Sequence, residues 1–216
     1  MYPFGPQYCE TPDVLTAFPA ETWNTWSNLI IVAFGLLALY LVYRRAPRAY
    51  DLWVLGILLV TNGVGSLLWH GLRTPWALAF DTTPGLLFLL FFVYFWARTF
   101  YGWLGAGLMF VAFLALQYLS ALLVDATFPE LPFFAGVAIP VVLLGLLLTW
   151  RSYRVSGRAA LLGILALVLA LSALLFRSID LWACEYITMG THFLWHGLLS
   201  AGAFSGILSL LALRSK

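Results

Sequence analysis

Long apolar runs constrain this chain more than any other feature of its sequence. Runs of about 20 hydrophobic residues, the length that an α-helix needs to cross a bilayer, recur in nearly every part of it. Hydrophobic residues make up 63% of the 216 positions and charged residues only 9%, whereas roughly a quarter of the residues of a soluble domain are charged. We therefore predict an all-α membrane protein, in contact with membrane lipids, with no separate soluble domain. Nothing in the composition indicates a nucleic-acid partner.

Seven apolar runs predict a bundle of seven transmembrane helices. The first spans are Trp23–Tyr43, Leu52–His70, Pro84–Tyr101 and Trp103–Val124, and the last three are Pro132–Trp150, Ala159–Phe176 and Thr191–Leu213. Only Arg98 and Gly102 mark the boundary between the third and fourth spans. Residues 1–22 would form an N-terminal arm, residues 23–213 the seven-helix domain and residues 214–216 a tail. The first residues lack the basic and apolar segments of a cleaved signal peptide, so the first span is expected to be retained.

The distribution of basic residues predicts the orientation of this bundle. Nine of the eleven fall at one end of the predicted spans, namely Arg44, Arg45, Arg48, Arg98, Arg151, Arg154, Arg158, Arg214 and Lys216. Only Arg73 and Arg177 fall at the other end. Because cytoplasmic loops carry an excess of lysine and arginine, we expect the N-terminus to be extracytoplasmic and the C-terminus cytoplasmic.

Both cysteines fall on the extracytoplasmic side of this topology, where disulfides can persist. Cys9 lies in the N-terminal arm, and Cys184 lies between the sixth and seventh spans. A bridge between them would tie the arm to the entrance of the last span. The alternative is a pair of unrelated reduced thiols, and shared sidedness alone does not decide between the two.

Two of the three histidines lie four residues apart at the start of the last span. Positions i and i+4 share one face of a helix, so His192 and His196 would present two imidazoles side by side. Helices use this spacing to hold zinc. His70, at the end of the second span, would add a third nitrogen ligand and leave one position open, which is typical of a catalytic zinc site.

Other polar residues are predicted to reach the same level of the membrane as these histidines. They occur in the first, second, third and seventh spans, at Glu21, Asn24, Asn28, Asn62, Ser66, His70, Asp81, His192, His196 and Ser200. Ionisable groups are costly inside a bilayer, and each one is a candidate for function. Their shared depth near the extracytoplasmic boundary indicates one site rather than scattered structural contacts.

Several of these residues also have simpler interpretations. His70 alone could be an interfacial residue, Asp81 a helix N-cap and Ser66 a small residue at a helix contact. Asn24 and Asn28 are expected to be structural and to bond across helices. The paired histidines of the last span are harder to explain in this way, and they favour a metal site.

Four motifs in this order resemble those of the alkaline ceramidase family. They are Glu-Thr-Trp-Asn-Thr-Trp-Ser-Asn-Leu from Glu21, Ser-Leu-Leu-Trp-His from Ser66, Asp-Thr-Thr-Pro from Asp81 and His-Phe-Leu-Trp-His from His192. This family belongs to a superfamily of seven-helix membrane hydrolases that includes the adiponectin-type receptors. The motifs cover the arm and spans one, two, three and seven, whereas spans four to six match only as hydrophobic helices.

The resemblance implies a zinc-dependent amidase that hydrolyses ceramide, or a related N-acyl lipid, to a fatty acid and a sphingoid base or amine. The zinc ligands would be His70, His192 and His196. Asp81 would act on the attacking water as general base and acid, and Ser66 would help to stabilise the oxyanion. The cysteine pair also matches a disulfide of the family.

The resemblance further implies a calcium site with ligands at Glu10 and Glu21. Gln7 stands where the family has an aspartate, and Pro12 where it has an asparagine. Calcium favours six to eight oxygen ligands, including several carboxylates. With only two carboxylates left, we expect calcium binding to be weaker here or lost.

Three other functions remain as alternatives. A lipid receptor or sensor of the same superfamily would keep the histidines, but Asp81 and Ser66 favour an enzyme. A haem protein needs axial ligands on opposite sides of a porphyrin, which an i, i+4 pair does not provide. A transporter would be expected to show internal repeats, and the sequence has none of that kind.

Overall fold

The computed structural model describes residues 4–15, 17–127 and 134–214, and in these ranges its regular secondary structure consists of helices alone, as predicted. The helices are α1 (Thr22–Arg45), α2 (Tyr50–Leu72), α3 (Pro75–Thr127), α4 (Phe134–Tyr153), α5 (Gly157–Ser178), α6 (Asp180–Ala183) and α7 (His192–Arg214). The first two residues of the predicted fifth span, Pro132 and Phe133, lie outside the described residues.

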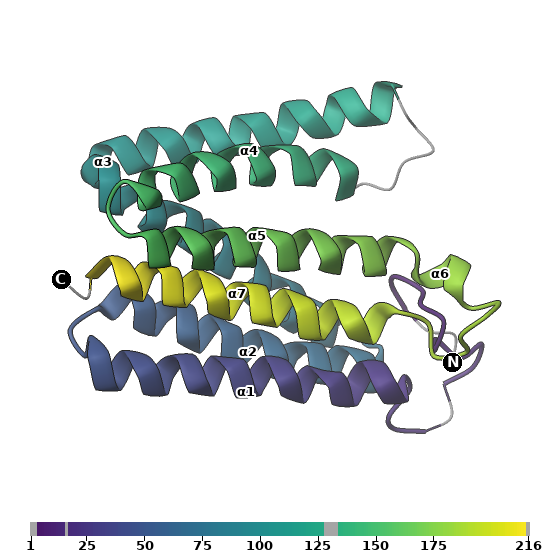
Figure 1. Cartoon of the computed structure of the whole chain (residues 1–216). Coiled ribbons are helices and arrows are strands. Elements are labelled where there is room, and N and C mark those ends of the chain that lie inside the picture. The colour runs from purple at the N-terminus through teal and green to yellow at the C-terminus, as the bar shows by residue number, and fades with distance from the viewer. Residues whose placement is uncertain (1–3, 16, 128–133, 215–216) are drawn as a thin grey trace.

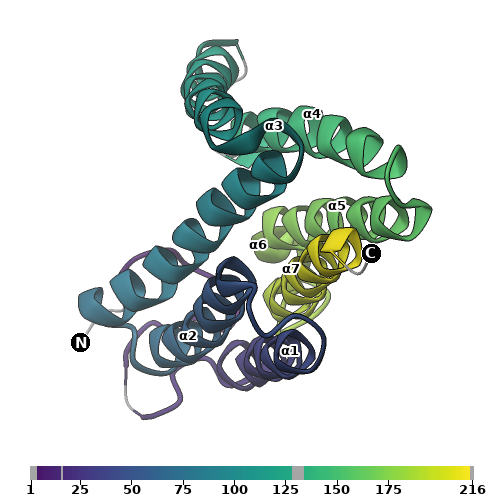
Figure 2. The same cartoon turned by 90° about the vertical axis from the view of Figure 1, so that its left-hand side faces the viewer.

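The long helices run side by side along one axis (Figure 1). Helices adjacent in the chain pack against each other in turn from α1 to α5, α5 packs against α7, and α7 returns to α1. Figure 2 shows this arrangement from one end of the bundle. The N-terminal arm and α6 lie at one end, and the described C-terminus lies at the other (Figure 1). The short connections explain why sequential helices are antiparallel neighbours.

Five helices, α1, α2, α3, α5 and α7, are long and apolar enough to cross a membrane. In α4 the apolar stretch Ala138–Tyr153 is shorter. Large hydrophobic side chains are exposed along these helices, as for Leu104 and Leu161. In water such a surface would be unfavourable, whereas lipid tails can cover it. The fold therefore fits an integral membrane protein.

Helix α3 bends at Gly102, the position that the sequence marks as the boundary between the third and fourth spans. A helix of 53 residues would be about 80 Å long, far more than the roughly 30 Å of a bilayer core. The φ angle of Gly102 is 67°, a left-handed conformation that glycine adopts at little cost. The chain turns back here, and α3 forms two arms (Figures 1 and 2).

The first arm of α3 differs from the prediction, because it begins at Pro75 rather than at Pro84. Proline has no N–H and therefore leaves the carbonyl of Phe80 without its helical donor. Beside it, the side chain of Asn62 on α2 donates to the next carbonyl, that of Asp81, at 2.7 Å. Membrane helices tolerate an internal proline where neighbouring helices bond the backbone around it, and the Asn62 bond is one such contact beside Pro84. Asp81 is therefore an interior residue of α3 and not a helix cap.

Basic residues are divided between the two ends of the bundle as the sequence predicts. Eight lie near the end of the bundle opposite α6, at the ends of α1, α4 and α7, at the starts of α2 and α5, and close to the bend of α3. Arg73 and Arg177 lie at the other end, which also holds the histidines. Lys216 lies outside the described residues.

Candidate metal centre

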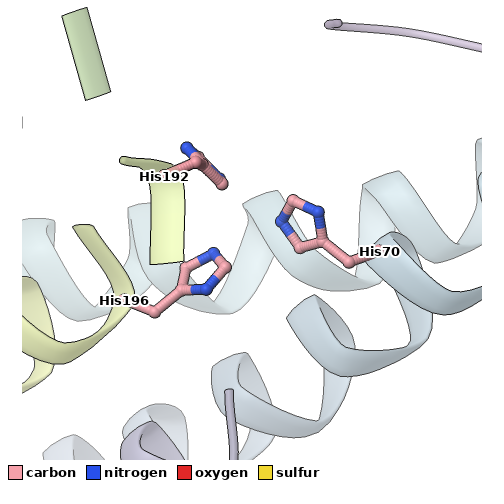
Figure 3. A group of neighbouring side chains, drawn as sticks. All are labelled: His70, His192 and His196. Atoms are coloured by element: carbon pink, nitrogen blue, oxygen red, sulfur yellow. The ribbon is translucent and has the colours of Figure 1, made fainter. Parts of the chain in front are cut away.

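Helices α2 and α7 bring the three histidines together at the end of the bundle that carries the N-terminal arm. His70 lies in the last turn of α2, and His192 and His196 lie in the first two turns of α7. All three are buried, with exposed fractions of 1 to 2%. One ring nitrogen of each lies within 4.8 Å of the others. Figure 3 shows the rings turned toward a common space, and such a group could hold a metal ion.

The buried carboxylate of Asp180 fixes the start of α7. Its Oδ1 accepts hydrogen bonds from the backbone N–H groups of Thr191 at 2.7 Å and His192 at 2.9 Å. Its Oδ2 accepts one from the N–H of Cys9 at 3.1 Å. Asp180 therefore satisfies two donors at the helix N-terminus and holds the arm beside them. The predicted disulfide between Cys9 and Cys184 is present and fastens the same arm.

His70 is oriented by the carboxylate of Glu21, the residue that precedes α1. The distance between His70 Nδ1 and Glu21 Oε2 is 2.5 Å. A carboxylate accepts and does not donate, so Nδ1 carries the proton and Nε2 keeps its lone pair for a metal. A carboxylate behind a histidine is the usual support of a metal ligand, because it fixes the ring and raises the basicity of the other nitrogen.

His196 is oriented by the hydroxyl group of Ser27 on α1. The distance between His196 Nδ1 and Ser27 Oγ is 2.7 Å. Ser27 also donates to the carbonyl of Asn24 at 3.1 Å. Because a hydroxyl has only one proton, His196 Nδ1 must be the donor to Ser27. This again leaves Nε2 available, and the donor set fits a divalent metal that prefers imidazole nitrogen.

The third histidine has a different environment. The ring of Tyr8 lies 3.9 Å from that of His192, measured between centroids. Arg177 NH1 lies 3.5 Å from His192 Nδ1 and 3.4 Å from the hydroxyl of Tyr8. The guanidinium of Arg177 also lies over the ring of Trp195, 5.3 Å from its centroid. A permanent positive charge therefore lies at the edge of the histidine group.

Ser66 lies one turn before His70 on α2, and Asp81 lies on the part of α3 that packs against this turn. A Cβ atom on Gly65 would lie 2.0 Å from the carbonyl oxygen of Phe80, so only glycine permits this contact. Ser66, next to Gly65, is buried at this contact, and Asp81 follows Phe80 on the facing helix. Ser66 precedes His70 by four residues and shares its helix face. Asp81 is not part of the group of side chains that could hold the metal ion.

The sequence pattern of the family described as Ceramidase matches residues 6–216, nearly the whole chain. The chain belongs to the ceramidase family. This membership implies a hydrolase that acts on amide bonds, with a lipid amide in the membrane as its substrate. No curated protein matches the chain significantly. The matched residues include the three histidines and the side chains that support them.

In this ceramidase-family chain, the two carboxylates expected at a calcium site already accept hydrogen bonds from the protein. Glu10 accepts from the backbone N–H groups of Trp23 at 2.9 Å and Asn24 at 2.7 Å, and so caps α1. Glu21 accepts from the hydroxyl of Thr11 at 2.6 Å as well as from His70. Burial raises the pKa of Glu10, and the two backbone hydrogen bonds oppose this shift.

Arg73 supplies a positive charge to Glu21 from within the chain. Its NH1 lies 3.0 Å from Glu21 Oε1, and its NH2 donates to the carbonyl of Pro6. The guanidinium also lies over the rings of Trp69 and Tyr8. Burial raises the pKa of Glu21, and Arg73 opposes that shift most strongly. With both carboxylates engaged and a cation beside Glu21, the donor set does not fit calcium.

Sequence reasoning did not identify Ser27, Arg73 and Asp180 as parts of this site. Ser27 lies inside the motif that begins at Glu21, whereas the sequence marks Arg73 only as a charged residue between two spans. Asp180 lies four residues before Cys184, and that proximity to a predicted disulfide was the available signal. Asn24 and Asn28, expected to bond across helices, instead bond within the first turns of α1, to Glu21 and to the carbonyl of Asn24 respectively.

Proposed function

We propose that the protein is a zinc-dependent amidase that hydrolyses ceramide, or a related N-acyl lipid, to a fatty acid and a sphingoid base or amine. The observation that carries this proposal is the convergence of three buried histidines in a ceramidase-family chain. Nδ1 of His70 is bonded to Glu21 and Nδ1 of His196 to Ser27, which leaves Nε2 of each ring for a metal. Three neutral nitrogen ligands with an open fourth position are typical of catalytic zinc.

Each polar residue of the site has a role in this reaction. When bound by His70, His192 and His196, zinc would polarise the amide carbonyl and lower the pKa of water. Asp81 would accept the proton of the attacking water and deliver it to the departing nitrogen. Ser66 would donate a hydrogen bond to the negative charge that develops on the carbonyl oxygen. Ser66 lies one turn from His70 on the same face of α2, which supports this role.

We further propose that the chain crosses the membrane seven times, with its site near the extracytoplasmic face. The two arms of α3 would be separate spans joined at Gly102. Eight of the ten described basic residues lie at the end opposite the histidines, which favours a cytoplasmic location for that end. The disulfide at the histidine end supports the same orientation. An acyl chain could then lie among apolar helices while its amide reaches the site.

The proposal is tested by metal analysis combined with a turnover assay on purified protein. We expect about one zinc per chain and release of free fatty acid from ceramide. A chelator should abolish the release, and added zinc should restore it to the metal-free protein. A panel of other N-acyl lipids would define the amine portion that is accepted. Zinc-loaded protein that binds ceramide but releases no fatty acid would contradict the proposal and would indicate a lipid sensor instead.

A further inference from the structure

A second polar site lies at the end of the bundle opposite the histidines. It is a cavity of about 470 Å³. Its lining comes from the α1–α2 connection and from α2, α3 and α7, and consists of Arg48, Ala49, Asp51, Arg98, Thr99 and Arg214. Asp51 and His70 are 19 residues apart on α2, which corresponds to about 28 Å along the helix axis. The cavity is therefore separate from the candidate metal centre.

Within the cavity, one acidic residue is paired with one of the three arginines. Arg214 NH1 lies 2.7 Å from Asp51 Oδ1, and Arg214 NH2 lies 2.5 Å from Asp51 Oδ2. This two-point contact fixes the guanidinium and neutralises the carboxylate. Arg48 and Arg98 are exposed. The lining thus carries three positive charges and one negative charge, a net charge of +2.

Other arginines at this end of the bundle are placed differently. Arg44 donates to the hydroxyl of Tyr40 at 3.2 Å. Arg151 lies over the ring of Tyr101, and Arg154 lies over that of Trp150. Basic residues that only set the orientation of a membrane protein need no common target. The arginines of the cavity come from different elements and converge on one hollow, and this arrangement requires a further explanation.

We propose that this cavity binds the phosphate group of an anionic phospholipid. Guanidinium groups match the geometry of phosphate oxygens and can donate two parallel hydrogen bonds. The cavity also lies at the level expected for lipid head groups. Tyr50 precedes Asp51 and is 76% exposed, and Trp103 follows the bend of α3 and is 75% exposed. Exposed tyrosine and tryptophan side chains typically lie at the membrane–water interface.

A bound phosphate would join three parts of the chain that meet only at this end. Arg48 belongs to the α1–α2 connection, Arg98 to the first arm of α3 and Arg214 to the last turn of α7. A ligand that binds only the folded protein stabilises it in proportion to its concentration. Anionic lipid should therefore raise the melting temperature of the protein, and phosphatidylcholine, which has no net charge, should raise it less.

The test compares two double variants that remove the same charge from the same end of the bundle. R48Q/R98Q changes the cavity, whereas R45Q/R158Q changes two exposed arginines outside its lining. Retention of phosphatidylglycerol and phosphatidylcholine by purified protein is measured by native mass spectrometry. We expect the cavity variant to retain about 25-fold less phosphatidylglycerol, from about fivefold for each of the two arginines. The control should change little, because Arg45 and Arg158 do not line the cavity and would not donate to a phosphate group bound in it.

Two further measurements separate the possible outcomes. R48K/R98K keeps both positive charges. If R48Q/R98Q is folded and lacks only the phosphate site, R48K/R98K should retain more phosphatidylglycerol than R48Q/R98Q does. Equilibrium dialysis with radiolabelled inorganic phosphate tests the free anion. Equal losses of retained phosphatidylglycerol in the cavity variant and the control variant would overturn the proposed site. Binding of inorganic phosphate without selective retention of phosphatidylglycerol would overturn the lipid as its source and leave a site for the free anion.

Discussion

His70 and Glu21 are 49 positions apart in the sequence, yet His70 Nδ1 lies 2.5 Å from Glu21 Oε2. The other oxygen of the same carboxylate lies 3.0 Å from Arg73 NH1. Arg73 in turn donates to the carbonyl of Pro6 in the N-terminal arm. A continuous series of polar contacts thus connects the arm to a candidate metal ligand. Changes at the arm should therefore be detectable at the metal.

Glu21→Gln should weaken metal binding without changing the three histidines. Glutamine removes the negative charge behind His70, and loss of such a supporting group usually costs 10- to 100-fold in metal affinity. The measurement is a competition titration of zinc against a chromophoric chelator. Glu185→Gln is the matched control, because Glu185 is an exposed carboxylate at the same end of the bundle. Equal zinc affinity in the two variants would remove Glu21 from the support of the metal.

Arg73→Gln should increase the affinity of the arm for calcium. In the native chain the guanidinium already neutralises Glu21, and a second cation there would be repelled. Without it, the buried carboxylate is left unpaired, at a cost of about 3–5 kcal/mol in stability. Equilibrium dialysis with radiolabelled calcium should show stronger binding to Arg73→Gln than to the native protein, and calcium should raise the variant's melting temperature more. Tight stoichiometric calcium binding by the native protein would contradict this account.

Much of the fold could be predicted because membrane helices are defined by local composition. Runs of about 20 apolar residues mark the spans in the sequence itself, and Gly102 marks the bend of α3 by its conformational freedom. The start of α3 was placed nine residues too late, at 84 rather than 75, since Pro84 suggested a helix start. The helix nevertheless continues through the proline, and Asn62 of α2 bonds the carbonyl of Asp81 beside it. That hydrogen bond comes from another helix, so the sequence around Pro84 does not indicate it.

The same division applies to the site. His192 and His196 were predictable from their spacing on one helix, and His70 from its level in the membrane. Arg73 could not be predicted as part of the site, because its burial depends on the arm that folds over it and on the rings of Trp69 and Tyr8. Contacts between distant segments leave no periodic pattern in the sequence.

Asp180→Ala should destabilise the start of α7 and weaken zinc binding. The substitution removes the acceptor for the N–H groups of Thr191, His192 and Cys9. Loss of a helix N-cap costs about 0.5–2 kcal/mol, and here His192 is itself one of the capped residues. Thermal unfolding and zinc competition are the measurements, with Asp13→Ala as the control because Asp13 is an exposed acidic residue of the N-terminal arm, which Asp180 contacts at Cys9. A native melting temperature and zinc affinity in Asp180→Ala would show that the cap is dispensable.

Asp81→Asn and Ser66→Ala should separate catalysis from metal binding. Asparagine cannot accept the proton of water, so Asp81→Asn should lose about 10²- to 10⁴-fold in kcat and keep stoichiometric zinc. Ser66→Ala removes one donor to the developing oxyanion and should lose about 10²- to 10³-fold in kcat. His192→Ala should lose the metal itself, which gives the contrasting result in the same assay. Fatty-acid release and zinc content are measured on each protein, and native turnover by Asp81→Asn would exclude Asp81 as the general base.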